Sequence, residues 1–273
     1  MSKIDPRRNS VTAIALTATK SMFGLSLRNL SLAIVVVLTV RPSDRPTVAQ
    51  SRAISDNSFL IEEAYNQEPG VVQHISAWQR SLRSAAWGYT FTQEWPVGTQ
   101  THQLSYTIPV QRTARPSSTG LGDAALNYRY QLRGAGRRVA IAPRLSVLLP
   151  TGSAARGLGT GHTGVQLNVP VSVLLAPTLV THWNAGVTAV PHTTTYNLGA
   201  SVIWLLRPTF NALVEVTWVE QGGAHDVVVN PGVRWAHNFT SGLQIVPGLA
   251  FPDGKAAFVY LSFEHRFKSA DRP

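Results

Sequence analysis

The chain has 273 residues, of which 44% are hydrophobic and only 14% are charged, and its formal net charge is +10. It contains no Cys, which excludes a disulfide scaffold, a thiolate nucleophile and cysteine-ligated metal sites. The charged fraction is well below the roughly 25% of soluble domains, yet apolar and aromatic residues are spread too widely for a disordered chain.

Residues 1–49 have the pattern of an export signal. They carry 7 Lys/Arg and 2 Asp/Glu, so this stretch holds +5 of the +10 net charge. Basic residues precede an apolar run at 30–40, and the small residues at 47–49 offer cleavage before Gln50. The run is shorter than the roughly 20 residues of a membrane-spanning helix. We predict a signal peptide over 1–49, with Met22 as an alternative start and an uncleaved anchor as the alternative interpretation. Without this stretch, little in the charge supports nucleic-acid binding.

Residues 50–70 form an acidic segment with Asp56, Glu62, Glu63 and Glu68, and residues 59–65 have the length of two helical turns. Two placements are open for it. It tucks into the lumen of the barrel predicted below as a plug or gate, or it forms a periplasmic tail. Glu62 and Glu63 are the plug candidates, and their partners in the lumen would be Arg129, Arg144, Arg234 or Arg266.

Residues 71–267 repeat one pattern, in which apolar and polar residues alternate over about ten positions. In the last repeat, Val259, Leu261 and Phe263 alternate with polar residues such as Ser262 and Glu264. A period of two is typical of a strand. Twelve such segments begin near residues 71, 84, 100, 121, 138, 163, 178, 195, 209, 225, 242 and 256. The connections at 111–120 and 150–162 are predicted to be the two longest loops.

Two architectures fit such strands. A soluble sandwich or barrel turns its apolar face inward, whereas an outer-membrane barrel turns it outward to lipid and lines its lumen with polar residues. Aromatic residues gather near the strand ends, and residues 50–273 contain only two Lys, Lys255 and Lys268. Both features favour the membrane. We predict an all-β fold, an antiparallel up-and-down transmembrane β-barrel of about 12 strands over residues 71–267, followed by a C-terminal tail at 268–273.

Charged residues within the strands fall mostly on the polar face. The candidates that line the lumen are Arg129, Arg144, Glu215, Arg234, Glu264 and Arg266. They either line a permeation path and set its preference, or pair across strands inside a nearly closed barrel. Eight strands leave room only for side chains and sixteen enclose an open channel, so twelve predict a narrow, partly filled pore.

Three stretches resemble a known family of exported barrels. They are residues 57–74, the sequence Gly120-Leu121-Gly122-Asp123, and Leu149-Pro150-Thr151-Gly152 followed by residues 157–161. The family is labelled for the meta-pathway of phenol degradation, or simply as outer-membrane transporters, and the similarity extends over about residues 57–267. This resemblance implies a Gram-negative outer-membrane barrel that passes small hydrophobic or aromatic compounds. One departure is that six residues follow Phe267, whereas outer-membrane barrels usually end on the aromatic itself.

Motifs for covalent chemistry or cofactor binding are weak. The glycine-rich stretch at 157–164 precedes a strand pattern and not the helix that a phosphate loop requires, so we interpret it as a mobile external loop. The eight His residues show no metal-ligand spacing, and there is no GxSxG sequence. A Ser-His-Asp site assembled across strands stays open. We predict no enzyme activity, no cofactor and no metal.

The function that this pattern favours is a monomeric bacterial outer-membrane barrel for the passive passage of small hydrophobic or aromatic compounds. Its expected partners are outer-membrane lipid, the barrel assembly machinery and those solutes, with no nucleic acid. The alternatives are a barrel enzyme that acts on outer-membrane lipid and a structural barrel without transport.

Overall fold

The computed structural model describes residues 53–134, 137–239 and 243–266, with nothing described for the side chain of Arg266. The predicted signal peptide at 1–49, Phe267 and the tail at 268–273 therefore lie outside the described residues. None of the residues described forms a helix long and apolar enough to cross a bilayer.

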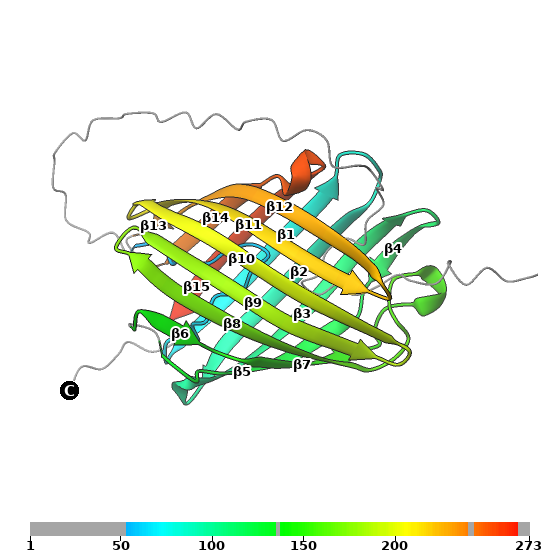
Figure 1. The fold of residues 1–273 in the computed structure, drawn as a ribbon, viewed down its shortest axis with the longest axis horizontal. Coiled ribbons are helices and arrows are strands. Elements are labelled where there is room, and N and C mark those ends of the chain that lie inside the picture. The colour runs from blue at the N-terminus through cyan, green and yellow to red at the C-terminus, as the bar shows by residue number, and fades with distance from the viewer. Residues whose placement is uncertain (1–52, 135–136, 240–242, 267–273) are drawn as a thin grey trace, which may run out of the picture.

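Tilted antiparallel strands make up almost all of the regular structure (Figure 1). They are β1 (Val71–Ser81), β2 (Trp87–Val97), β3 (Thr99–Ala114), β4 (Ser117–Leu121), β5 (Ala124–Tyr130), β6 (Val139–Ile141), β7 (Arg144–Leu149), β8 (Gly164–Ala176), β9 (Leu179–Val190), β10 (Thr193–Arg207), β11 (Phe210–Gln221), β12 (Ala224–Trp235), β13 (His237–Asn238), β14 (Gln244–Ala250) and β15 (Ala256–Arg266). Two short 3-10 helices, η2 (Ala154–Arg156) and η3 (Pro252–Gly254), lie in connections.

The strands close into a barrel. Each long strand pairs with its neighbours in the chain, β1 pairs with β15, and β12 pairs with β14, so the sheet has no free edge strand. Three of the fifteen β elements are short additions, since β4 pairs only with β3, β6 continues the line of β7 along β8, and β13 pairs only with β14. The remaining twelve form the wall, which confirms the predicted antiparallel barrel and its strand number.

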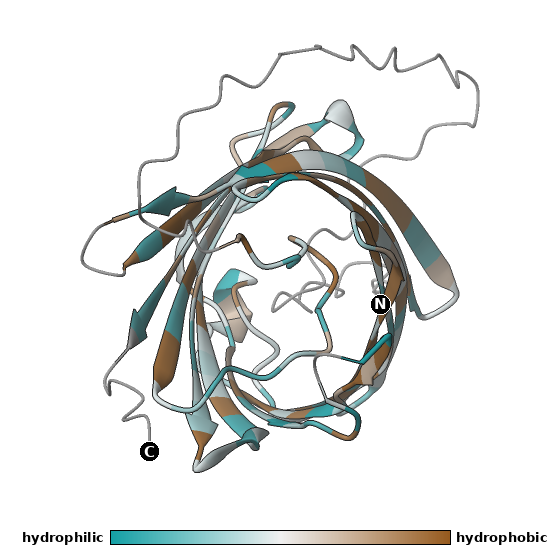
Figure 2. Ribbon diagram, turned by 90° about the vertical axis from the view of Figure 1, so that its left-hand side faces the viewer, coloured by the Kyte–Doolittle hydropathy of each residue, from teal (hydrophilic) through white to brown (hydrophobic). Residues whose placement is uncertain are grey.

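The apolar face of this wall is the outer face. In β15, Val259 and Leu261 are 39% and 41% exposed, whereas Tyr260 and Ser262 between them are 4% and 2% exposed. The same alternation occurs along the other long strands, whose inner positions carry Asn, Gln, Ser and charged residues. Figure 2, which looks into the barrel, shows strand after strand alternating between hydrophobic and hydrophilic residues. A polar interior and an apolar exterior suit a wall that faces hydrocarbon.

Two local predictions were wrong. The connection at 111–120 is not a long loop, because β3 continues to Ala114 and β4 pairs with it in a hairpin that turns at Arg115 and Pro116. Thr113 favours this hairpin, since its Oγ1 donates to the carbonyl oxygen of Pro116 at 2.6 Å. Residues 59–65 form no helix, because their backbone N–H groups donate to side chains of the wall and not to one another.

The two ends of the barrel differ. At one end, β1 begins opposite the end of β15, and tight turns connect β8 to β9 and β10 to β11; we call this end the terminal rim. The opposite end, the loop rim, carries the β3–β4 hairpin and the connection at 150–163. Outer-membrane barrels keep short turns in the periplasm and longer loops outside the cell.

Candidate functional site: the lumen and the segment that crosses it

Residues 54–68, the N-terminal segment, lie inside the barrel (Figure 2). The segment begins at the terminal rim, where the backbone N–H of Ile54 donates to the carbonyl oxygen of Pro208 between β10 and β11. It returns to the same rim on the opposite wall, where the Asn66 amide donates to the carbonyl oxygens of Gln100 and Thr101 in β3. Between these points it crosses the lumen.

Glu215 of β11 binds the backbone in the middle of the segment, at residues 59–61. Its Oε1 accepts the backbone N–H groups of Phe59, Leu60 and Ile61 at 3.0, 2.7 and 3.0 Å, and its Oε2 accepts from Asn230 at 2.7 Å. Three successive N–H groups that converge on one oxygen form an anion-binding concavity of the kind that a tight backbone bend creates. The carboxylate, which is 0% exposed, therefore has partners for both oxygens.

An apolar anchor lies beside this hydrogen-bonded bend. The ring of Phe59 packs against Phe258 and Tyr260 of β15, with ring centroids 5.3 and 5.5 Å apart. Two strand glycines make room for it, since a Cβ at Gly232 would lie 2.5 Å from the Phe59 ring and one at Gly248 would lie 2.6 Å from it. Glycine within a strand often marks such a close approach.

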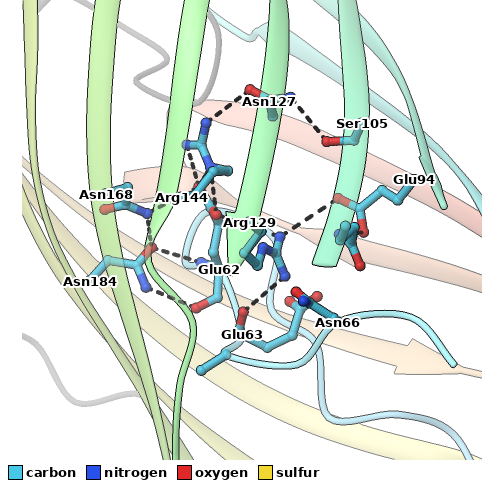
Figure 3. Close-up of polar contacts among 12 residues, drawn as sticks. Glu62, Glu63, Asn66, Glu94, Ser105, Asn127, Arg129, Arg144, Asn168 and Asn184 are labelled. Carbon is cyan, nitrogen blue, oxygen red and sulfur yellow. Dashed lines mark hydrogen bonds and ion pairs between the residues drawn. The ribbon is translucent and has the colours of Figure 1, made fainter. Parts of the chain in front are cut away.

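Glu62 of the segment forms a buried ion-pair cluster with the opposite wall (Figure 3). Its carboxylate accepts from Nη2 of Arg144 at 2.6 Å and from Nε at 2.9 Å, and Nη2 of Arg129 lies 3.6 Å from it. Arg129 also lies 3.7 Å from Glu94 of β2 and donates to the carbonyl oxygens of Glu63 and Tyr65. A bidentate arginine–carboxylate pair is geometrically specific, so the cluster fixes Glu62 in one position.

The two neighbouring glutamates of the segment differ in pKa. Burial would raise the pKa of Glu62, but Arg144 and Arg129 outweigh it and hold this pKa below its usual range. Burial raises the pKa of Glu63 to about 7, because the attraction of Arg129 does not offset it and the Glu94 carboxylate adds repulsion. Glu62 is therefore ionised near neutral pH, whereas Glu63 is partly protonated.

Arg234 and His182 bind the start of the segment. Nη1 of Arg234 donates to the carbonyl oxygens of Asn57 and Ser55 at 2.6 and 3.1 Å, and its guanidinium lies 5.0 Å from the Tyr260 ring centroid. Nε2 of His182 lies 2.8 Å from the carbonyl oxygen of Asp56. The wall thus contacts backbone atoms of the segment as well as its carboxylates.

The predicted lumen residues differ in what the structure shows of their contacts with the N-terminal segment. Arg129, Arg144, Glu215 and Arg234 are all buried, and each contacts the N-terminal segment. Glu264 lies in β15 opposite Gln73 of β1 and Gln244 of β14, on the polar face. Arg266 ends β15, and its side chain lies outside the described part.

A cavity lies on the loop-rim side of this cluster. Thr217 and Val219 of β11 belong to its lining, and both are nearer the loop rim than Glu215. One part of the lining is apolar and is formed by Leu60, Ile61, Val219, Val228 and Pro252. The other part is polar and contains Gln79, Glu62, Arg144, Gln166, Asn168, Asn184, Asn197 and Thr217.

A second segment folds inward at the loop rim. Residues 150–163 place Leu158, which is 1% exposed, over the lumen-facing side of β3 and β4, where Gln111 donates to the Leu158 carbonyl oxygen at 3.0 Å. The Asp123 carboxylate accepts the backbone N–H groups of Gly152 and Thr160 and the Thr160 hydroxyl, at 3.0, 2.7 and 2.8 Å. The stretch predicted to be a mobile loop is thus bound near both of its ends by one buried carboxylate, and its mobility stays a prediction.

Several residues of the site did not stand out in the sequence. Asp123 was named only as part of a motif, and Glu94, His182 and Asn184 were not singled out at all. The glycines within strands, such as Gly199, Gly232 and Gly248, were the available signal, since a Cβ at any of them would overlap the N-terminal segment. Within the described ranges, no group of three or more His, Asp or Glu residues could hold a metal ion.

No protein-family model matches the chain, and no curated protein matches it in sequence. Similar solved structures exist. The COG4313 outer membrane channel from Pseudomonas putida has 15% sequence identity and a TM-score of 0.52, over 75% of this chain and 98% of the channel. The KdgM porin has 7% identity and a TM-score of 0.51, over 72% of this chain and 99% of the porin. The KdgM porin in complex with disordered oligogalacturonate has 8% identity and a TM-score of 0.50, over the same shares of 72% and 99%.

These likenesses, together with the apolar outer face, identify the fold as that of a bacterial outer-membrane β-barrel. The solved structures reported above are channels and porins by description. The resemblance to the phenol-degradation family stays a prediction.

Proposed function

We propose that this protein is a monomeric outer-membrane channel for the passive passage of small solutes, with the N-terminal segment as its plug. One observation carries the proposal. Several buried charged side chains of the wall, Glu215, Arg144 and Arg234 among them, bind the segment as well as or instead of their neighbours on the wall. A barrel that served only as a solid support would fill its lumen with side chains of its own wall.

The solutes that suit this lumen are small hydrophobic or aromatic compounds. The apolar part of the cavity lining, which includes Ile61, Val219 and Val228, offers a surface for a ring or a short alkyl chain. The amides of Asn168, Asn184 and Asn197 opposite it offer hydrogen bonds to a single polar group. Pockets of this mixed kind are typical of small-molecule sites.

An acidic sugar, such as the oligogalacturonate of the KdgM complex, is less well suited. Arg144 is the basic residue in the cavity lining, and the carboxylate of Glu62 already neutralises it. An anionic solute would have to displace that buried carboxylate, which makes a bidentate ion pair.

An enzyme that acts on lipid has one structural feature in its favour, because Oγ of Ser172 lies 2.7 Å from Nδ1 of His182. Both residues are buried, with exposed fractions of 1% and 0%. The Ser172 oxygen also accepts the backbone N–H of Ala64, and Nε2 of His182 lies against the carbonyl oxygen of Asp56. Both groups are thus used to hold the segment, so we assign them a structural role.

The test of the plug is single-channel conductance in planar bilayers, after heat-modifiable gel migration has shown a folded barrel. Glu62→Ala with Glu63→Ala removes the ion pairs to Arg144 and Arg129 and the Asn57–Glu63 hydrogen bond within the segment, so the current should rise several-fold. The matched control is Glu220→Ala, which removes a glutamate near the loop-rim end of β11 whose carboxylate accepts the backbone N–H of Gly223. Unchanged current in the double variant would overturn the plug, and equal rises in both variants would make the effect unspecific.

The solute class is tested by uptake into proteoliposomes. Phenol-sized aromatic compounds should enter faster than sugars of similar mass, and the difference should grow in the Glu62→Ala, Glu63→Ala variant. Replacing Val219 and Val228 by Ser makes the apolar part of the lining polar. If this variant keeps the same preference, the proposed solute class is wrong while the plug proposal stands.

A further inference from the structure

Three residues form a row on the outer surface at the loop rim. Arg80 of β1 pairs with Trp87 of β2, and Trp87 pairs with Arg112 of β3. Residues directly opposite each other in antiparallel strands point to the same face of the sheet. Lumen-facing Gln79 and Gln111 precede the two arginines in their strands, so the row points outward. Both arginines are exposed.

The row lies at the boundary of the apolar outer face. The next outward positions toward the middle of the barrel are Trp78, Tyr89 and Val110, which are again neighbours on the same three strands. Beyond the row the strands pass into the turn at 82–86 and into the β3–β4 hairpin. Tryptophan and tyrosine mark the level at which hydrocarbon meets the headgroups, so the two arginines lie at headgroup height.

The two arginines of the row add positive charge at this rim, and no described carboxylate pairs with them. Among the ion pairs between described residues, none involves Arg80 or Arg112. Arg83 and Arg115 lie in the turns next to the row. The nearby Asp253 is already paired with Lys255 at 3.1 Å. Two arginines on the outer face, with no carboxylate of the described ranges bound to them, fit an anionic lipid headgroup.

We propose that Arg80 and Arg112 bind the phosphate groups of lipopolysaccharide in the outer leaflet, with Trp87 packed against the sugar or acyl part between them. The planar guanidinium matches a phosphate with two parallel hydrogen bonds. Two strand spacings separate the arginines by about 10 Å, which lets them hold two phosphates of one headgroup or share one. The proposal rests on the outer-membrane placement of the proposed function but not on transport.

We place the loop rim in the outer leaflet because it carries the long connection at 150–163 and the β3–β4 hairpin, whereas β1 begins and β15 ends at the opposite rim. At that terminal rim the outward residues near strand ends are mostly aromatic, such as Trp95, Trp204 and Trp235. Its exposed Arg207 ends β10 at the turn, and the residues in line with it on the next two strands are Phe210 and Trp235. Arg207 therefore serves as the matched control.

The experiment is native mass spectrometry of the full chain in detergent, titrated with a lipopolysaccharide that retains lipid A and the inner sugars. The double variant Arg80→Gln, Arg112→Gln should bind it at least about tenfold more weakly, whereas Arg207→Gln should bind like the wild type. Phosphatidylglycerol and inorganic phosphate are the two comparison probes. Both should bind the wild type much more weakly, because neither presents two phosphates on one rigid headgroup.

Three results would overturn the proposal: unchanged lipopolysaccharide binding in the double variant, an equal loss in Arg207→Gln, or phosphatidylglycerol binding that is as strong and equally dependent on the two arginines. Heat-modifiable migration checks that each variant is folded, and Trp87→Leu with both arginines intact should weaken binding by a smaller factor. Single-channel conductance should be the same in the double variant and the wild type. A failed lipid test with normal conductance would therefore leave the proposed channel intact.

Discussion

Two segments fold into the barrel from opposite ends, and they are held in different ways. The N-terminal segment contacts side chains from β3, β5, β7, β8, β9, β11 and β12, and its main contacts are charged. Residues 150–163 are held chiefly by one carboxylate, Asp123, and by the apolar side chain of Leu158. The contacts of the first segment are distributed over most of the wall, whereas those of the second are confined to one sector, formed by β3, β4 and the start of β5.

Glycines leave the space in which both segments pack closely against their neighbours. A Cβ at Gly199 would overlap the Ile61 side chain, and a Cβ at Gly152 or Gly159 would overlap the backbone of the inward-folded loop. Backbone atoms cannot move aside as the end of a flexible side chain can. The loop therefore tolerates a new Cβ at its glycines less well than the N-terminal segment does at Gly199. We therefore expect one glycine substitution to move only side chains of the N-terminal segment, whereas one at the loop should displace residues 150–163 together.

The largest effect is expected for Glu215→Ala. Three backbone N–H groups lose their acceptor, and at about 1 kcal/mol for each hydrogen bond the docked segment loses about 3 kcal/mol. Hydrogen exchange at Leu60 and Ile61 should become faster by about two orders of magnitude, and single-channel current should rise. Exchange in residues 150–163 should not change, and a change there would show that the two segments are coupled.

Asp123→Ala should have the next largest effect, on the other segment. Gly152 and Thr160 lose the acceptor that joins the two ends of the loop, so limited proteolysis should begin to cleave within 150–163. The N-terminal segment should stay protected. Asp123→Asn keeps one acceptor oxygen and should give an intermediate rate of cleavage, whereas cleavage as slow as in the wild type would contradict the role of the carboxylate.

A smaller effect is expected for Gly159→Ala, in which the new methyl group would meet the Asp123 carboxylate and the backbone of Gly152. The loop should shift and lose protection, with the barrel itself unchanged in heat-modifiable migration. Gly88→Ala is the matched control, because a Cβ at Gly88 meets nothing within 4 Å. Equal protection of the loop in the two variants would mean that its packing is looser than the structure indicates.

The smallest effect is a pH dependence of the N-terminal segment. The pKa of Glu63 rises from 4.5 to about 7 when the segment docks in the lumen. Its contribution to the stability of the docked segment is therefore fully present below pH 4.5 and is lost as the pH rises through 7. The lowered pKa of Glu62 acts in the opposite sense, since its contribution is present above pH 4.5 and is lost only as the pH falls below that. Of these two glutamates, Glu63 therefore has the larger effect between pH 5 and 8.

The channel should accordingly be more open at pH 8 than at pH 5.5, by about 30-fold in the ratio of open to closed states. The measurement is open probability in planar bilayers at the two pH values. Glu63→Gln cannot ionise, so it should remove most of this dependence. If the variant keeps the full pH dependence, another group is responsible.

Much of the fold could be predicted because each strand carries its own signal. The alternation of Val259, Leu261 and Phe263 with polar residues requires no knowledge of the other strands. The hairpin of β3 and β4 was missed because its Ser, Thr and Gly residues also suit a loop, and only pairing with β3 decides between the two. The four inward charges Arg129, Arg144, Glu215 and Arg234 were identifiable from their place on the polar face.

The sequence by itself determined the barrel, its strand number and the polarity of its two faces, because period-two alternation is local and repeats in every strand. Only the tertiary structure decided what those inward charges contact. The partners of Glu215 and Arg144 are about 150 and 80 residues away, at Phe59–Ile61 and Glu62. Nothing in the local pattern distinguishes a carboxylate that faces water from one that binds a distant backbone, since that choice depends on which segment the closed wall encloses.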